Sequence, residues 1–188
     1  MNYKAVMIGG SAGSFQVVTK ILSSLPKNYV MPVFLCLHRL KHVRSGFVEA
    51  LSIKATLPIS EPNDKDPIKP GKIYLAPANY HMFIELGNKF ALSTEEAVNH
   101  SRPSIDLSFM SAAYSYKKKL VGIILSGANK DGAYGLKKVK DTGGLTVVQD
   151  PNECQVTTMT TASMKLTPVD HVLSTEKIIE LLLKINKR

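Results

Sequence analysis

Short apolar runs alternate along the chain with stretches in which apolar residues recur every three or four positions. The apolar runs occupy residues 3–8, 31–37, 120–125 and 145–149. The helical spacing occupies residues 15–25, about 46–53, about 104–116, about 133–142 and about 175–185. Continuous apolar runs that alternate with helices are typical of a parallel sheet covered by helices on both faces.

The pattern changes in the middle of the chain, where three short strands are expected at 72–76, 81–86 and 89–93. Gly87-Asn88 separates the last two and predicts a tight antiparallel hairpin. We therefore expect a three-layer α/β/α fold, doubly wound around a mainly parallel sheet with an inserted β-hairpin. The chain contains no repeat and no linker, so we expect one domain over residues 1–188.

Composition narrows the class of protein. Of the 188 residues, 44% are hydrophobic, which is enough to bury a core and excludes a chain that is mainly disordered. The longest apolar runs are about a quarter of the ~20 residues that a membrane-spanning helix needs, so we expect no membrane insertion. Residues 1–10 lack the features of an export signal. The two cysteines, Cys36 and Cys154, are far apart, and we expect reduced thiols and a cytoplasmic location.

The formal net charge of +9 suggests anionic partners but does not by itself identify one. Lysines gather at 117–119 and 137–140 and, with Arg188, at the end of the chain, where we expect them to solvate the protein surface. No aromatic-rich RNA motif, zinc finger or basic zipper is present, so we do not expect nucleic-acid binding. Neither cysteine has a Cys or His partner at metal-ligand spacing, so we expect no metal site.

The carboxyl ends of the expected strands are the places to look for chemistry, because loops and helix amino termini converge there. After the first strand comes Gly9-Gly10-Ser11-Ala12-Gly13, which fits the G-x-S-x-G turn that exposes a serine nucleophile between a strand and a helix. The same glycine-rich turn is also suited to hold a phosphate without any catalysis. The motif alone leaves both functions open for Ser11.

A histidine and an aspartate follow two further strands. His38 comes directly after the second strand and is expected within reach of Ser11, where a general base is needed. Asp131 lies in the loop after the strand at 120–125, either as the cap of the next helix or as the carboxylate that orients His38. The order Ser, His, Asp differs from that of the α/β-hydrolases, which argues against a lipase-type enzyme.

Six segments in the same order resemble the catalytic domain of chemotaxis protein-glutamate methylesterases (CheB-type). They lie at 8–13 (IGGSAG), 37–38 (LH), 70–77 (PGKIYLAP), 81–82 (HM), 102–106 (RPSID) and 125–133 (LSGANKDGA). The resemblance runs through nearly the whole chain and implies a serine hydrolase without a cofactor. It places the nucleophile at Ser11, the base at His38 and the orienting acid at Asp131.

The resemblance also implies what such an enzyme acts on. Family members demethylate glutamate methyl esters on chemoreceptor helices and release methanol, and some deamidate receptor glutamines. The expected partner is therefore a methylated chemoreceptor or a similar acidic helical protein. The family usually carries a phosphorylatable receiver domain ahead of the catalytic domain, whereas this sequence starts at the first catalytic strand, so we expect a constitutive enzyme or a separate regulator. A non-catalytic anion-binding module remains an alternative.

Further residues are candidates for supporting roles. We expect the backbone amides of Ala12 and Ala128 to stabilise the oxyanion, since one opens the first helix and the other lies in the Asp131 loop. Arg39, in the basic loop after the base, is a candidate for binding an acidic substrate. The resemblance places Met159 near the substrate cleft. For Arg102 and Asp106 we favour a structural role at the start of the helix near residue 104.

Overall fold

The apolar runs of the sequence form nine strands within residues 2–38 and 46–186, which are the residues that the computed structural model describes. The strands are β1 (Ala5–Gly10), β2 (Val33–Leu37), β3 (Ile59–Ser60), β4 (Ile73–Leu75), β5 (His81–Glu85), β6 (Lys89–Ser93), β7 (Leu120–Ile124), β8 (Leu145–Gln149) and β9 (His171–Leu173). β1, β2 and β7 are buried along their whole length, as their unbroken apolar sequence requires.

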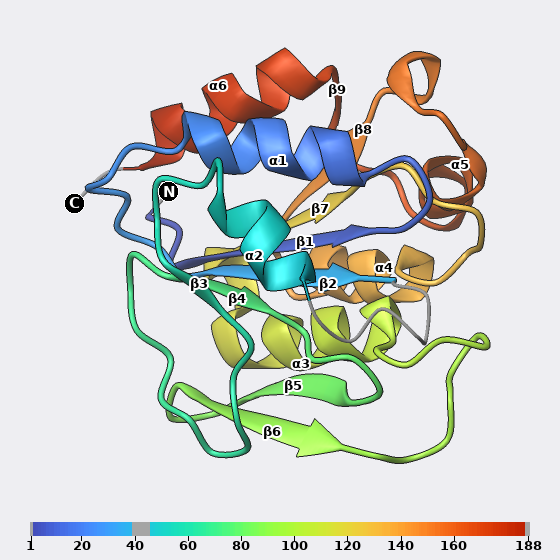
Figure 1. Cartoon of the computed structure of the whole chain (residues 1–188). Helices are drawn as coiled ribbons and strands as arrows, with labels where there is room; N and C mark the ends of the chain where they lie inside the picture. The colour runs from blue at the N-terminus through green and yellow to red at the C-terminus, as the bar shows by residue number, and fades with distance from the viewer. Residues whose placement is uncertain (1, 39–45, 187–188) are drawn as a thin grey trace.

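Six α-helices and two short 3₁₀ helices connect these strands in the described part of the chain. They are α1 (Phe15–Ser24), α2 (Phe47–Ser52), α3 (Ile105–Tyr116), η1 (Lys117–Lys119), α4 (Ala133–Asp141), η2 (Pro151–Glu153), α5 (Thr158–Leu166) and α6 (Thr175–Ile185). Figure 1 shows α1 and α6 on one side of the central sheet, α3 and α4 on the other, and the β5–β6 hairpin outside α3.

The main sheet is parallel and has the order β3-β4-β2-β1-β7-β8-β9. β1 lies in the middle, and the chain passes from it to β2 on one side and later to β7 on the other. The order therefore reverses beside β1, and in such sheets the crevice at the carboxyl ends of the strands at that point is where ligands bind. The expected three-layer fold with its separate antiparallel hairpin, β5–β6, is confirmed.

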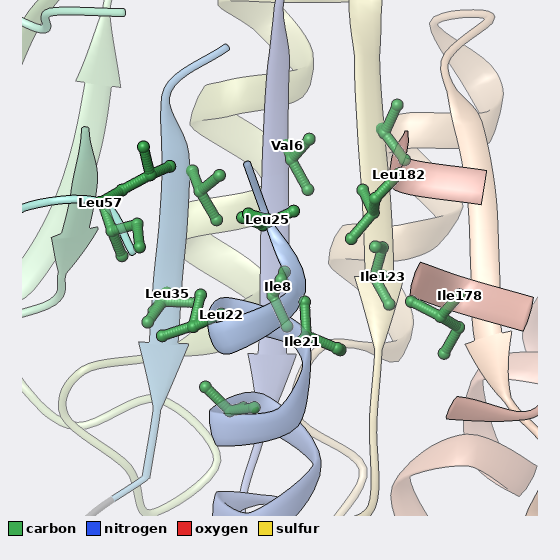
Figure 2. Close-up of a cluster of buried hydrophobic side chains, with 14 of the residues drawn as sticks. Val6, Ile8, Ile21, Leu22, Leu25, Leu35, Leu57, Ile123, Ile178 and Leu182 are labelled. Atoms are coloured by element: carbon green, nitrogen blue, oxygen red, sulfur yellow. The ribbon is translucent and has the colours of Figure 1, made fainter. Parts of the chain in front are cut away.

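Alternate side chains of each central strand point to opposite faces of the sheet and build two cores. On one face, Ile21 and Leu22 of α1 and Ile178 of α6 pack over Ile8 and other side chains of the sheet, as Figure 2 shows. On the other face, Phe109 of α3 and Leu136 of α4 pack with Met7 and Phe34 of the sheet. Burial on both sides holds the strand ends in fixed positions.

Three details differ from the expected pattern. The strand at 73–75 belongs to the parallel sheet, where β4 pairs with β2, and only β5 and β6 are antiparallel. β3 is too short to give a periodic signal. α5 was not expected, because its threonines favour other conformations; Thr160 Oγ1 and Thr161 Oγ1 donate hydrogen bonds to the carbonyl of Thr157 within the helix.

Candidate active site

Ser11 stands on the sharp turn that joins β1 to α1. Its N–H donates to the carbonyl of Ser126 at 2.9 Å, and the hydroxyl of Ser14 donates to the Ser11 carbonyl at 2.7 Å. Gly13 has φ +80°, and a Cβ there would lie 2.6 Å from Gln155 Cβ, so the turn needs glycine at this position. The backbone of Ser11 is thus held on both sides, while its side chain is only half-buried.

His38 follows β2 at the strand end next to Ser11. Gly10 is paired with Leu37 in the parallel ladder, and the N–H of His38 donates to the carbonyl of Gly10 at 3.1 Å. Neighbouring strands lie about 4.8 Å apart, so the residues that follow this pair are side by side. In the described residues, no hydrogen bond joins the Ser11 hydroxyl to the His38 ring, whose nitrogens contact Asp131 and Ser101.

The His38 ring contacts Asp131 directly, with 2.8 Å between Nε2 and Oδ2. An ionised carboxylate only accepts hydrogen bonds, so Nε2 of a neutral His38 carries the proton and Nδ1 is the nitrogen with a free lone pair. The Ser101 hydroxyl lies 3.5 Å from Nδ1. The arrangement therefore offers Nδ1, and not Nε2, as the basic nitrogen on the side of the ring away from Asp131.

Asp131 is fully buried against the amino terminus of α3. Its Oδ2 accepts the N–H of Ile105 at 2.7 Å, and its Oδ1 accepts the N–H of Asp106 and the hydroxyl of Ser104, each at 3.0 Å. The first turn of a helix presents unpaired N–H groups and a partial positive charge, which suit a carboxylate. Asp131 does not cap α4, the helix that follows it in the chain; it binds α3 and His38 instead.

The pKa of Asp131 reflects these contacts. Burial by itself raises the pKa, but the hydrogen bonds from His38 and from the amides of Asp106 and Ile105 outweigh it, so the pKa lies below the ordinary value of 3.8. A carboxylate held ionised in a buried position stabilises a protonated imidazole beside it. The electrostatics of the pair therefore suit a histidine that gains a proton during a reaction.

Asp106 makes the reciprocal contact from α3 to α4. Its Oδ1 accepts the N–H of Gly132 at 2.9 Å and that of Gly135 at 2.7 Å, at the first turn of α4. Burial raises the pKa of Asp106, and the nearby charge of Asp131 raises it further against the lowering effect of these amides. The first turn of α3 thus binds Asp131, from the loop before α4, and the first turn of α4 binds Asp106 of α3; this crossed arrangement fixes the loop that carries Asp131.

Other polar side chains support this arrangement without having been singled out from the sequence. Asn99 Nδ2 donates to Asp106 Oδ2 at 3.0 Å and to Asp131 Oδ1 at 3.4 Å. The buried His81 accepts the N–H of Ser104 on Nδ1 at 3.1 Å and contacts the Glu96 carbonyl through Nε2. Of these, Ser104 carried a signal as a serine directly before a helix, and His81 lay in one of the segments that carry the resemblance, whereas Asn99 carried none.

Two backbone amides belong to the loops beside Ser11, at Ala12 and Ala128. Ala12 and Ala128 are exposed, and in the described part of the chain neither N–H donates to another protein group. Ser126 ties their two loops together, because its hydroxyl donates to the Ala12 carbonyl at 2.7 Å. Unpaired donors held by fixed loops at the rim of the sheet are what a developing oxyanion requires.

Three further residues were named from the sequence: Met159, Arg39 and Arg102. Met159 is fully buried in α5, and its side chain packs against Gly127 in the loop that carries Asp131. It therefore offers no surface to a substrate. Arg39 and the loop 39–45 lie outside the described residues. Arg102 donates to the carbonyls of Thr94 and Glu95 and makes no ion pair with Asp106. Its contacts fit the expected structural role.

A metal cluster or a membrane-spanning helix would indicate another class of function for the described residues, 2–38 and 46–186. No group of three or more His, Cys, Asp or Glu side chains is arranged to hold a metal ion. None of the helices found there is both long enough and apolar enough to span a bilayer.

Comparison with known proteins gives consistent results. The family model described as CheB methylesterase matches residues 6–182. A relative from Leptospira interrogans is 43% identical over 187 residues, which cover 100% of this chain and 97% of the relative. A Thermotoga maritima relative named protein-glutamate methylesterase/protein-glutamine glutaminase is 32% identical, and the match covers 97% of this chain but 54% of the relative.

The fold has a counterpart among solved structures. The crystal structure of the Thermotoga maritima CheB methylesterase catalytic domain matches with a TM-score of 0.92 and 31% identity, over 98% of this chain and 100% of that one. The chain therefore spans about half the length of the Thermotoga relative and corresponds to its catalytic domain.

Proposed function

The chain belongs to the CheB methylesterase family, and from this premise we propose that it hydrolyses glutamate methyl esters on proteins, with Ser11 as nucleophile, His38 as base and Asp131 as orienting acid. The observation that carries the proposal is the contact of 2.8 Å between His38 Nε2 and the fully buried Asp131, at the strand end beside Ser11. A serine alone would be a weak nucleophile, and the neighbouring imidazole supplies the base it needs.

The proposed reaction has two steps. Ser11 Oγ attacks the γ-ester carbonyl while His38 Nδ1 takes its proton; the protonated ring then donates the proton to the departing methoxide, and methanol leaves an acyl-enzyme. Water hydrolyses the acyl-enzyme by the same route and returns the Ser11 hydroxyl. Throughout, Asp131 keeps Nε2 protonated and stabilises the positive charge on the ring.

In each step a negative charge develops on the carbonyl oxygen. The proposed donors are the N–H groups of Ala12 and Ala128, because both are exposed and without a protein acceptor in the described residues. Their loops are joined through Ser126, so the donors need little rearrangement as the charge forms. Loss of one donor of this kind in other enzymes costs about 10²- to 10³-fold in rate.

The substrate that we propose is a methylated chemoreceptor or a similar acidic helical protein, as the family's activity implies. The net charge of +9 favours encounter with an acidic protein surface. The enzyme's proposed site of action is the cytoplasm.

A second activity, deamidation of protein glutamines, is favoured by the Thermotoga relative's name, which includes protein-glutamine glutaminase. The same nucleophile and base serve both reactions, because an amide differs from an ester here in releasing ammonia in place of methanol. The two activities are therefore separated by the product released and not by the residues used.

The direct test is methanol release from a methylated receptor fragment, with ammonia release from the glutamine form measured in parallel. Replacement of Ser11 by Ala is expected to lower the rate at least about 10⁴-fold, and His38→Gln to have a similar effect, since triad members act as a unit. Ser23→Ala, on the exposed face of α1, is the control and keeps full activity. Full activity in Ser11→Ala, or fragment binding without turnover by the unaltered protein, would refute the hydrolase proposal.

A further inference from the structure

A cavity lies at the end of the sheet opposite Ser11, where the amino ends of β1 and β7 meet the end of α3. Its volume is about 840 Å³, within the range of small-molecule sites. In Figure 1 this edge is the one nearest the N label, whereas β1 and β2 end at the other side of the molecule. The cavity is therefore separate from the candidate active site.

Four lysines line the cavity: Lys4 before β1, and Lys117, Lys118 and Lys119, which form η1. No Asp or Glu is among the described residues that line it, and none of the four lysines pairs with a carboxylate in the described chain. Other lysines are neutralised locally; Lys65, for example, pairs with Glu85 at 2.6 Å. The cavity thus concentrates uncompensated positive charge.

The backbone holds two of these lysines close together. The N–H of Lys4 donates to the carbonyl of Lys119 at 2.8 Å, and Ala5 is paired with Leu120 at the start of the parallel ladder. Lys4 directly precedes β1 and Lys119 directly precedes β7, and like charges at such neighbouring positions repel each other and lower stability. If these lysines served only to solvate the surface, a neutral or acidic residue in place of one of them would remove the repulsion and give a more stable fold.

Lys117 is also held in an unfavourable backbone conformation, with φ 50° and ψ −132°. This region suits glycine and is costly for a residue with a long side chain. Glycine is the usual choice where a helix ends in such a turn. The presence of lysine therefore favours a role for the side chain that outweighs the strain.

The wall beside the lysines is largely apolar and includes Ile68 and Tyr116. The Tyr116 hydroxyl donates to Asn88 Oδ1 at 3.3 Å, and burial raises the pKa of Tyr116 to about 12, so the phenol adds no negative charge. One side of the cavity thus attracts anions, and the other offers a surface on which a flat ring can pack.

We propose that this cavity binds a short chain of phosphates, either free polyphosphate or the phosphate chain of a nucleotide. The four lysine residues belong to one turn and to the position before an adjacent strand, and all of them line a single hollow, so their positive charges favour a compact, highly charged anion. Phosphate oxygens accept several charge-assisted hydrogen bonds from lysines at once. A nucleotide would in addition place its base on the wall at Ile68 and Tyr116.

The test is calorimetric titration of the full chain with inorganic tripolyphosphate and with ATP, without added metal, at low salt and again at physiological salt. The double variant Lys118→Ala/Lys119→Ala is expected to bind tripolyphosphate at least about tenfold more weakly. The matched control, Lys165→Ala/Lys177→Ala, removes the same charge from exposed positions on α5 and α6 and is expected to change affinity less than about twofold. Equal losses in both variants, or no binding by the unaltered chain, would overturn the proposal.

Lys117→Gly separates a ligand role from a structural one. Glycine relieves the backbone strain, so the melting temperature is expected to stay the same or rise while tripolyphosphate affinity falls. A fall in melting temperature with unchanged affinity would contradict the role we assign to Lys117.

Further probes distinguish the source of the phosphates. Tighter binding of ATP than of tripolyphosphate, reduced by Ile68→Ala, identifies a nucleotide site; equal affinities identify a polyphosphate site. A hexaglutamate peptide is the competing anion, and affinity equal to that of tripolyphosphate would overturn the phosphate assignment in favour of an acidic protein segment.

Discussion

Charged side chains at the two ends of β1 lie in opposite environments, one buried and hydrogen-bonded, the other exposed and without acidic partners in the described residues. At the carboxyl end, Asp131 is fully buried and has five hydrogen-bond donors, from His38, Asn99, Ser104 and the amides of α3. At the amino end, Lys4 and the three lysines of η1 are exposed and have no acidic partner in the described residues.

The difference follows from the cost of burial. A buried charge is stable only if its hydrogen-bonding capacity is met, so the carboxyl end must be built with precision. An exposed charge is solvated by water, so unpaired lysines are tolerated at a small loss of stability. The carboxyl end is therefore suited to fixed catalytic geometry, and the amino end to capture of a soluble anion.

The largest effect is expected from removing the buried carboxylate. Asp131→Ala leaves the α3 amides, the Ser104 hydroxyl and His38 without their acceptor, and we expect a loss of about 3–5 kcal/mol in the free energy of unfolding. Urea denaturation measures it, with Lys119→Ala as the control at the other end of the sheet, expected within about 0.5 kcal/mol of the unaltered chain. Similar small losses for both would remove the distinction between the two ends.

The next effect concerns the close contact of α3 and α4 that lets Asp106 reach the α4 amides. A Cβ on Gly135 would lie 2.6 Å from Phe109 Cβ and 3.0 Å from the Asp106 backbone, so Gly135→Ala is expected to cost about 1–3 kcal/mol in unfolding free energy. Helix propensity alone predicts the reverse, a gain of about 1 kcal/mol. The sign measured by urea denaturation decides between them.

Acid is expected to weaken the carboxyl end selectively. Because the pKa of Asp131 is lowered on folding, its stabilising contribution is complete above the ordinary value of 3.8 and is lost as pH falls from there through the lowered pKa. The raised pKa of Asp106 acts in the opposite sense, so the two must be separated by a variant. The difference in unfolding free energy between the unaltered chain and Asp131→Ala should shrink below pH 3.8, and a constant difference would contradict the pKa assignment.

The smallest effect has the opposite sign and lies at the amino end. Lys117→Gly is expected to raise the unfolding free energy by up to about 1 kcal/mol, because it removes a strained conformation and one of four neighbouring positive charges. Thermal denaturation gives the result, and Lys165→Ala, which removes a charge without strain, is the control. A clear loss of stability would show that the lysine side chain supports the fold.

The sequence was informative about elements and strand ends but not about what fixes them. Ser11, His38 and Asp131 stood out because each follows a strand or precedes a helix, and order along the chain predicts which strand ends meet. Asp106 contacts residues of α4 that are far away in the chain, and Asn99 reaches Asp106 only because the chain turns between them. Helix capping is usually sought within a few residues, so the sequence offered two roles for Asp131, the cap of the next helix or the acid that orients His38, and gave no sign of its contacts with α3.

The lysines of η1 illustrate the same limit. From the sequence, residues 117–119 were expected to solvate a helix face, since charged runs at helix ends usually do. Their placement around a cavity depends on Lys4, which lies more than a hundred positions earlier, and on the hairpin that closes the other side. The sequence shows neither the strained backbone of Lys117 nor the lack of acidic partners around these lysines in the described residues.

The central claim is that His38 and Asp131 activate Ser11, and labelling with a fluorophosphonate tests it most directly. The reagent is expected to form a single adduct on the peptide that contains Ser11, as read by mass spectrometry, and to label His38→Gln far more slowly. No adduct on Ser11 under conditions that label other serine hydrolases, or equal labelling of the His38→Gln variant, would contradict it.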